Sequence, residues 1–256
     1  MTKSPAEVEL MAESGRLLAS VFTHLDSLPL AGMSTLEIND RVEAFITNQL
    51  NARPASKGQY GYGFVLNNSR NAVVCHGVPS ADEILTDGDI VNLDITLEKN
   101  GFIADSSKTY LIGTVSAPAR RLVRTTYEAL WKGIAAVRPG ARLGDLGHAI
   151  ERHAKKAGYS VVREYCGHGI GREMHEAPQV LHFGRPGTGL TLKEGMTFTI
   201  EPMLNQGRAA VRTGDDGWTV ITADGKLSAQ FEHTVAVTKT GVRVLTLRPE
   251  EARAVR

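Results

Sequence analysis

The stretch GDIVNLDITLEKNGFIADSSKTYLIG, residues 88–113, predicts a β-hairpin around which the rest of the chain is arranged. In its first arm, apolar residues occupy every second position from Val91 to Leu97, which is the period of a β-strand. Asn100-Gly101 then supplies two residues that accept the positive φ angles of a tight type I′ turn. A second apolar arm follows, so we expect two antiparallel strands joined by a two-residue turn.

The register of this hairpin places two carboxylates on one face. Counting outward from the turn pairs Asp94 with Ser107, and Asp105 lies two residues from Ser107, so it points to the same side as Asp94. A bulge near Ala104 would shift that register. One aspartate alone is usually a turn cap or a solvated strand residue, but two like charges on a half-buried sheet repel each other. The pair is therefore a candidate for binding one shared cation, provided that other ligands lie nearby.

Length and composition are those of a globular protein. The 256 residues suffice for one large domain or two small ones, and 42% of them are hydrophobic. A formal net charge of +1 gives no general attraction for nucleic acid or membranes, and no 18-residue apolar run predicts a membrane span. The first ten residues lack the apolar core of a signal peptide, and Cys75 and Cys166 make no disulfide framework, so we expect a cytoplasmic protein.

Capping signals predict where the helices begin. Ser4 and Glu7 form a capping box, with Pro5 at the first helical position, and a second box spans residues 34–37. The expected elements are a helix from Ser4 to before Pro29, a helix over 34–51, short strands over 64–74 with a turn at Asn67-Asn68, and helices over 116–137 and 143–157.

The order of elements before Gly113 is repeated after Ser116, which indicates an internal duplication. The matching segments are Ala31-Gly32, Glu37-Ile38 and Val42-Glu43 with Pro139-Gly140, Asp145-Leu146 and Ile150-Glu151, then His76-Gly77-Val78 with His168-Gly169-Ile170, Leu85–Gly88 with Leu192–Gly195, and Asp105–Ser107 with Glu232–Thr234. The equivalent acids Asp94 and Glu201 stand six residues after Gly88 and Gly195, respectively. Two such halves, about residues 4–113 and 116–246, predict a single α+β domain over 1–256. Each half reads helix, helix and strands, and a pseudo-twofold axis would bring the halves together around a central antiparallel sheet and cleft.

The duplication gathers five metal-ligating side chains at the centre: Asp94, Asp105, His168, Glu201 and Glu232. Carboxylates and imidazole suit Mn²⁺, Fe²⁺, Co²⁺ or Zn²⁺. Two divalent ions balance four ionised carboxylates and one ion does not, so we expect a dinuclear site with metals about 3.5–4 Å apart. Such a pair makes hydroxide available near neutral pH and polarises a carbonyl, which predicts metal-assisted hydrolysis of an amide or ester.

Other residues have candidate roles beside simpler alternatives. His175 follows the His168 loop and is either structural or a hydrogen-bond donor to a substrate carbonyl. His76, at the equivalent His-Gly position, is expected behind the ligands or against the substrate. A Cys–His nucleophile built on Cys75 or Cys166 is an alternative, but no third residue that would orient it is evident. The residues that would line either an apolar pocket or the core are Tyr62, Phe64, Met174 and Trp218.

Six segments resemble the type I methionine aminopeptidases, the dinuclear metallohydrolases of the pita-bread fold. They are VVCHGVP at 73–79, GDIVNLDITLEKNGFIADSSKTY at 88–110, YCGHGIGREMHEAPQVLHFG at 165–184, GMTFTIEPM at 195–203, DDGWTV at 215–220 and SAQFEHTVAVT at 228–238. The resemblance runs from about Ser4 to Thr246. It implies the pita-bread fold and the same five metal ligands, with Asp105 and Glu232 bridging both ions.

The resemblance also implies roles for residues around the ligands. His76 and His175 would bind the substrate and assist catalysis, and Glu201 would take part in proton transfer. The residues near the methionine side chain would be Tyr62, Met174 and Trp218. The family removes the initiator methionine from nascent proteins when the second residue is small, by attack of metal-activated hydroxide on the first peptide bond. Two divalent ions (Co, Mn, Fe, Zn or Ni) are implied as cofactors.

The same resemblance implies partners and a compartment. Substrates would be the N-termini of nascent peptides, met by a cytoplasmic monomer in transient contact with the ribosome, without a nucleic-acid site of its own. The sequence departs from the family pattern on the wall and rim of the pocket, which bears on the preference for the second residue. The departures are Asn67, Ala104, Glu173, Met174 and Ala177.

Two alternatives stay within the same fold. One is another aminopeptidase or an X-Pro dipeptidase, which would carry different residues around the second histidine and usually a longer chain. The other is a binding protein without catalysis. Because inactive relatives typically lose metal ligands and all five stand here, the sequence argues against the second.

Overall fold

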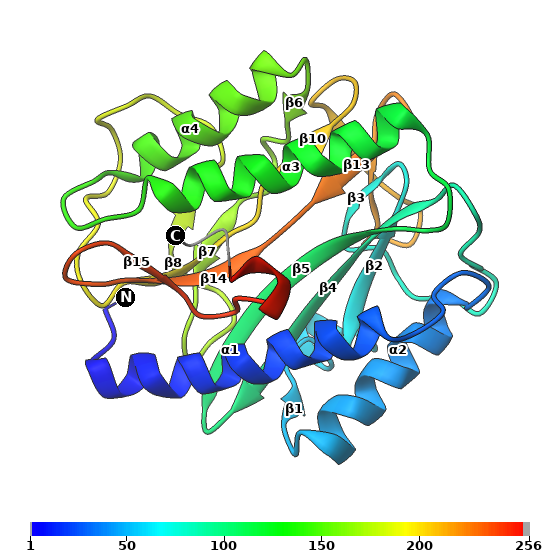
Figure 1. The fold of residues 1–256 in the computed structure, drawn as a ribbon, viewed down its shortest axis with the longest axis horizontal. Coiled ribbons are helices and arrows are strands. Elements are labelled where there is room, and N and C mark those ends of the chain that lie inside the picture. The colour runs from blue at the N-terminus through cyan, green and yellow to red at the C-terminus, as the bar shows by residue number, and fades with distance from the viewer. Residues whose placement is uncertain (1, 253–256) are drawn as a thin grey trace.

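The computed structural model describes residues 2–252, which form an α+β fold with antiparallel strand pairs (Figure 1). The helices are α1 (Pro5–Asp26), α2 (Thr35–Ala44), the π-helix η1 (Phe45–Gln49), the 3₁₀ turn η2 (Gln59–Gly61), α3 (Ala117–Ala135), α4 (Leu143–Lys156) and the 3₁₀ turn η3 (Pro249–Glu251). The strands are β1 (Arg53–Pro54), β2 (Leu66–Arg70), β3 (Val73–Cys75), β4 (Ile90–Lys99), β5 (Phe102–Leu111), β6 (Ser160–Val161), β7 (Gly167–Gly169), β8 (Glu176–Val180), β9 (Thr197–Ile200), β10 (Met203–Asn205), β11 (Val211–Thr213), β12 (Val220–Thr222), β13 (Ser228–Gln230), β14 (His233–Val237) and β15 (Val242–Val244). Within residues 2–252, no helix combines the length and the apolar character that crossing a bilayer demands.

The predicted hairpin is present as β4 and β5. Asn100 and Gly101 form its turn with φ angles of 55° and 77°, as type I′ geometry requires. The two strands pair without a register shift, with Asp94 opposite Ser107. The predicted register is therefore confirmed, and Asp94 and Asp105 lie on the same face of the sheet.

The helices begin at the predicted caps. Ser4 and Glu7 form a reciprocal capping box at the start of α1. At the start of α2, the Glu37 backbone N–H donates to Ser34 Oγ at 3.0 Å. All four predicted helices are confirmed, although the second continues as a π-helix from Phe45.

The turn predicted at Asn67-Asn68 is wrong. Both residues lie inside β2, opposite Asp94 and Leu93 of β4, and the chain turns instead at Asn71, where φ is 54°. The Asn71 side chain stabilises that turn, because its amide donates to a carboxylate and its oxygen accepts a backbone N–H. Pairing with β4 along the whole of β2 therefore outweighs the turn preference of two adjacent asparagines.

Each half of the chain packs its own pair of helices against its own strands. Figure 1 shows α1 and α2 along one side of the molecule and α3 and α4 along the opposite side, with strands between them. One buried apolar cluster joins Phe22 of α1 to Leu93 of β4, and another joins Leu130 of α3 to Val235 of β14. The core is thus built twice, once under each helix pair.

Equivalent backbone hydrogen bonds relate the two halves. The Gly32 N–H donates to the Leu85 carbonyl at 2.8 Å, and the Gly140 N–H donates to the Leu192 carbonyl at 3.0 Å. Each leucine N–H donates back to the residue after the glycine, at 2.9 and 2.8 Å. Both glycines have positive φ, 87° and 84°, which a side chain would disfavour. The segments matched in the sequence therefore share one backbone geometry.

The halves meet along a seam, defined here as the contact of β5 with β14 and the residues just before β14. The predicted central sheet is divided there, because β5 belongs to a sheet with β4 whereas β14 pairs with β9 and β15 in another. The Glu232 N–H donates to the Ser107 carbonyl across the seam at 3.1 Å. Thr234 Oγ1 donates to the Asp105 carbonyl at 2.8 Å. A few individual hydrogen bonds, rather than a continuous ladder, therefore join the halves.

Candidate metal centre

A cavity of about 400 Å³ lies between the two halves. Every residue predicted to bind metal, act in catalysis or bind substrate lines it, namely Tyr62, His76, Asp94, Asp105, His168, Met174, His175, Glu201, Trp218 and Glu232. The structure therefore brings together side chains from both halves that are far apart in the sequence. Phe64, which the sequence grouped with them, is not among the described residues that line this cavity.

Three of the predicted ligands form the tightest cluster. One ligand atom from each of Asp105, His168 and Glu232 lies within 4.8 Å of the other two. His168 Nε2 is 3.7 Å from Asp105 Oδ2 and 3.6 Å from Glu201 Oε1. Asp94 lines the same cavity beside them.

The orientation of His168 is fixed by its other ring nitrogen. Nδ1 lies 3.0 Å from the carbonyl of Gly169, so the Nδ1–H donates to that carbonyl and Nε2 keeps its lone pair. Burial, together with the neighbouring His175, lowers the pKa of His168 to about 4. The imidazole is therefore neutral near pH 7 and presents Nε2 to the carboxylates, which is the state a metal ligand requires.

Burial raises the pKa of all four carboxylates. It brings the pKa of Asp94 to about 6, and burial with the charge of Asp94 brings that of Glu201 to about 8. The pKa values of Asp105 and Glu232 lie well above their ordinary range, first because of burial and then because of the surrounding acids. Four acids crowded away from water hold protons unless a cation replaces them.

Unpaired oxygens show that the cluster fits metal ions. Asp105 Oδ1 and Glu232 Oε1 are buried and have no hydrogen-bond partner within residues 2–252. A buried carboxylate oxygen without a partner is costly, and a divalent cation would satisfy it. Oxygen donors with one imidazole match the preference of divalent metals such as Mn²⁺, Co²⁺ and Zn²⁺.

Glu201 is held by residues that the sequence did not single out. Thr199 Oγ1 donates to its Oε1 at 2.8 Å, and Gln230 Nε2 donates to its Oε2 at 3.3 Å. The Glu201 backbone N–H donates to Nε2 of the buried His182 at 3.1 Å. Gln230 lies two residues before Glu232 in the sequence, and this spacing could have indicated that Gln230 lies near the cluster of acids.

The two further histidines lie at the cavity wall. His175 packs its ring against His168, with ring centroids 4.4 Å apart, and its pKa is lowered by burial. His76 has a left-handed backbone (φ 57°), and its ring meets the edge of Tyr165. Burial and then His175 lower the pKa of His76. Both imidazoles are therefore available as neutral hydrogen-bonding groups beside the cluster.

The thiol alternative is not supported by the environment of either cysteine. Burial raises the pKa of Cys75 well above its ordinary value, and the charges of Glu201 and Asp94 add to that rise. The pKa of Cys166 is also raised by burial and by Glu201. A reactive thiolate needs an electropositive site, and this one is acidic.

Aromatic side chains also line the cavity. The rings of Tyr62 and Trp218 lie 5.4 Å apart, and Tyr62 Oη donates to the Leu66 carbonyl at 2.9 Å. Tyr60 also lines the cavity and was not identified from the sequence, which indicated only a Gly-rich loop there. Its hydroxyl lies 3.4 Å from His175 Nδ1, although 72% of the residue is exposed.

The departures from the family pattern divide between the cavity and its surroundings. Asn67 and Met174 line the cavity. Asn67 pairs with Asp94 across the sheet, and a hydrogen bond from its side chain lowers the pKa of that carboxyl against the effect of burial. Glu173 and Ala177 are exposed, and Ala104 is buried in the hairpin. Only two of the five departures are therefore placed to contact a ligand in the cavity.

Two halves of similar build around a cluster of acids and one neutral histidine define a metal-dependent hydrolase. The model of metallopeptidase family M24 matches residues 9–239, and the chain belongs to this family. The predicted cofactor class, divalent metal ions, agrees with that membership.

Individual relatives are similar over nearly the full length. Methionine aminopeptidase B of Synechocystis is 48% identical over 95% of this chain and 90% of its own. The methionine aminopeptidase of Escherichia coli K12 is 46% identical over 97% of this chain and 94% of its own. The crystal structure of methionine aminopeptidase from Rickettsia prowazekii superposes with a TM-score of 0.93 at 46% identity, over 96% of this chain and 99% of that one. The predicted pita-bread fold is thereby confirmed.

Proposed function

We propose that this protein is a metal-dependent aminopeptidase that removes the N-terminal methionine from proteins whose second residue is small. The observation that carries the proposal is the cluster of four buried or half-buried carboxylates and His168 in a cavity between the halves. The near-full-length similarity to methionine aminopeptidases supports the choice of substrate.

Five residues would hold two divalent ions in this cavity: Asp94, Asp105, His168, Glu201 and Glu232. Asp105 and Glu232 would contribute to both ions, which agrees with their central place in the cluster and with their unpaired oxygens. When bound, the ions supply Lewis acidity and lower the pKa of water.

The remaining polar groups would orient the substrate and move protons. His175 and His76 are neutral imidazoles at the wall, so each can donate one N–H to the peptide being cleaved. Glu201 is held by Thr199 and Gln230, and these bonds would fix the orientation of a carboxylate that accepts and returns a proton.

The apolar side chains that line the cavity would bind the methionine side chain. Tyr62 and Trp218 contribute aromatic rings, and Met174 adds a thioether, a group that packs well on another flexible sulfur-containing chain. Since Met174 and Asn67 both line the cavity, they are the departures expected to influence substrate preference.

The physiological setting is part of the same proposal. We infer that the chain acts as one catalytic domain, because neither half supplies all five ligands. Its substrates would be the N-termini of nascent proteins, met in the cytoplasm by a monomer in transient contact with the ribosome.

A peptide comparison after metal reconstitution tests the proposal. The protein is stripped with a chelator, reloaded with Mn²⁺ or Co²⁺, and offered Met-Ala-X peptides beside X-Pro dipeptides. Release of methionine from the first set alone is expected, whereas cleavage of the X-Pro set would favour a dipeptidase. Asp105→Ala should lose both bound metal and turnover. Full turnover by wild-type protein in excess chelator would refute metal dependence.

A further inference from the structure

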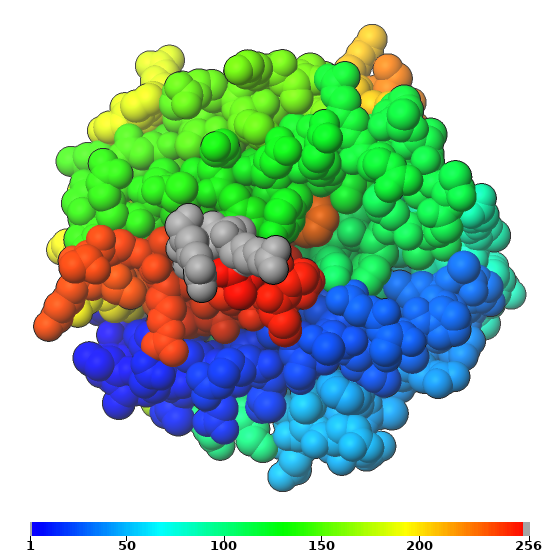
Figure 2. All heavy atoms as spheres, in the orientation of Figure 1, coloured from blue at the N-terminus to red at the C-terminus, as the bar shows by residue number. Residues whose placement is uncertain are grey.

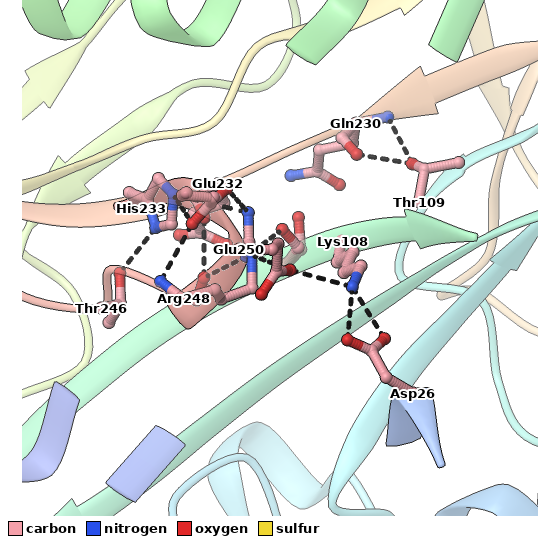
Figure 3. A network of polar contacts seen from close by, with 12 residues as sticks. Asp26, Lys108, Thr109, Gln230, Glu232, His233, Thr246, Arg248 and Glu250 are labelled. Carbon is pink, nitrogen blue, oxygen red and sulfur yellow. Dashed lines mark hydrogen bonds and ion pairs between the residues drawn. The ribbon is translucent and has the colours of Figure 1, made fainter. Parts of the chain in front are cut away.

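An ionic network closes the seam from the side opposite the cavity. Arg248 is 1% exposed, and its Nη2 lies 2.6 Å from Oε1 of Glu251, which is 2% exposed. Nε2 of His233 lies 3.1 Å from Glu251 Oε2 and 3.4 Å from Arg248 Nη2. Figure 3 shows Arg248 and His233 side by side next to Glu232, and Figure 2 shows the C-terminal segment (red) filling the space between the two helix pairs. We call Arg248, Glu251, His233 and Ser106 the C-terminal clamp.

The clamp contacts the backbone on both sides of the seam. Arg248 Nη1 donates to Ser106 Oγ at 3.2 Å and to the Ser107 carbonyl at 3.3 Å. Ser106 Oγ in turn donates to the Glu232 carbonyl at 2.7 Å. Ser106 follows Asp105 in the chain, and His233 follows Glu232. One guanidinium therefore reaches the neighbours of the two most central acids.

No continuous ladder fixes the spacing at this point. β5 and β14 belong to different sheets, so the distance between Asp105 and Glu232 depends on individual contacts across the seam. The contacts on the far side of the acids are those of the clamp, and Thr246 extends them by lying 2.9 Å from His233 Nδ1. A buried guanidinium with a fixed fork of donors suits this task better than a flexible ammonium.

We propose that Arg248 and Glu251 are positioning residues, which set the spacing of Asp105 and Glu232 and thereby the affinity of the centre for metal. This inference rests on the proposed function, because it assumes that the two acids hold ions. Residues behind metal ligands typically change affinity or activity by about 10- to 100-fold when they are substituted.

The exposed side of the same turn supplies a matched control. Glu250 is the neighbour of Glu251, but 47% of its side chain is exposed, and it pairs with Lys108 at 3.0 Å. Lys108 also pairs with Asp26 at the end of α1, at 2.7 Å (Figure 3). Glu250 Oε1 also lies 3.7 Å from Arg248 Nε. Glu250→Gln therefore removes an exposed charge from the same turn but leaves the bonds of Arg248 to Glu251, Ser106 and Ser107 in place. Exposed pairs of this kind contribute little to stability.

The experiment titrates the metal-free, full-length protein with Mn²⁺ in a calorimeter. Glu251→Gln should bind Mn²⁺ about 10- to 100-fold more weakly than wild type, whereas Glu250→Gln should stay within about twofold. On a Met-Ala-X peptide, Glu251→Gln should lower kcat with little change in KM, since the pocket for methionine is untouched. Wild-type affinity in Glu251→Gln would overturn the proposal.

Two further variants separate positioning from stability. Ser106→Ala removes one hydroxyl that links Arg248 to the Glu232 carbonyl, and it should weaken Mn²⁺ binding even if Glu251→Gln fails to fold. Arg248→Met with Glu251→Leu replaces the ion pair by apolar groups, which often preserves stability. That double variant should stay folded and bind Mn²⁺ weakly, and recovery of wild-type affinity would overturn the proposal. Wild-type protein that binds no Mn²⁺ would instead refute the metal centre and this inference with it.

Discussion

The two copies of the His-Gly motif have the same sequence position in their halves but different geometry. His168 lies in β7, where the Gly169 carbonyl fixes its tautomer and Nε2 faces Asp105 and Glu201. His76 follows β3 with a left-handed backbone, and its ring contacts Tyr165 rather than an acid. Both halves therefore carry an imidazole at this position, and the local backbone differs so that one of them faces the cluster of acids.

The acidic strands differ in a similar way. In the first half, Asp94 and Asp105 lie on one hairpin with a two-residue turn. In the second half, the strands β10 to β13 are inserted between Glu201 and Glu232. This insertion carries Trp218 and Gln230, which line the cavity. The first half thus joins its two acids by a short turn, while the second half places further cavity-lining residues between its two acids.

The largest effect should come from replacing each of the two histidines, one at a time, by alanine. His168→Ala removes a proposed ligand and should lower Mn²⁺ affinity by about a thousandfold, since a metal site loses a large share of its binding free energy with each ligand. His76→Ala should leave Mn²⁺ affinity within a fewfold but lower kcat by about 10²–10⁴, as expected for a group that assists proton transfer or binds the reacting carbonyl. Calorimetry and peptide kinetics on both variants decide this. Equal losses of metal would mean that His76 is a ligand and that the contrast between the halves is false.

The pH dependence of metal binding should differ between the equivalent acids Asp94 and Glu201. Burial raises their pKa values from 3.8 to about 6 and from 4.5 to about 8. Because the folded pKa values exceed the unfolded ones, these groups stabilise the metal-free fold at low pH, and that stabilisation is lost as the pH rises through about 6 and then 8. Metal displaces the protons, so Mn²⁺ affinity should rise about tenfold per pH unit for each proton displaced in this window.

Titrations with Mn²⁺ at pH 6, 7 and 8 measure this rise. Asp94→Asn removes the charge that raises the pKa of Glu201, so it should move the rise in Mn²⁺ affinity to lower pH, whereas Glu201→Gln should lower the slope between pH 7 and 8 by about one proton. Identical pH profiles in both variants would contradict this difference between the two acids. Glu251 is a useful contrast, because His233 and Arg248 overcome the effect of burial and lower its pKa to about 2. Its contribution to stability is lost only when the pH falls toward that value, well outside this window.

The smallest effect concerns the glycines of the repeated motif. A Cβ added at Gly77 would lie 2.0 Å from the Asn68 carbonyl oxygen, and one added at Gly169 would lie 2.1 Å from that of Ala177. Each Gly→Ala substitution should therefore destabilise the fold by about 1–3 kcal/mol, because backbone must shift. Gly241→Ala is the control, since nothing lies within 4 Å of its added Cβ. Denaturant unfolding of the three variants measures the effect, and a neutral Gly77→Ala would show that the two motifs are packed differently.

Much of the fold and the cluster followed from local signals. The two-residue turn fixed the hairpin register, and that register fixed which face Asp94 and Asp105 share. The repeat then paired Asp94 with Glu201 without any knowledge of the sheet. Capping boxes located the helices for the same reason: the chemistry lies within four residues of the boundary.

The features that the sequence did not predict depend on contacts between residues far apart in the chain, which no local sequence pattern indicates. Asn67-Asn68 reads as a turn, but pairing with β4 holds it in a strand. Tyr60 reaches His175 from a loop without periodicity. Arg248 contacts Ser106 across 142 positions of sequence, and an arginine near the end of a chain gives no sign that it is fully buried.

The division of the ligands between the halves bears on how such a centre can arise. A half-length ancestor would carry only part of the set of metal ligands. It would need to dimerise with an identical copy to form a complete, symmetrical site with two equivalent histidines. Fusion into one polypeptide removes that equality. Each half can then change independently. His168 stays next to the acids, while His76 becomes free to contact a molecule bound in the cavity.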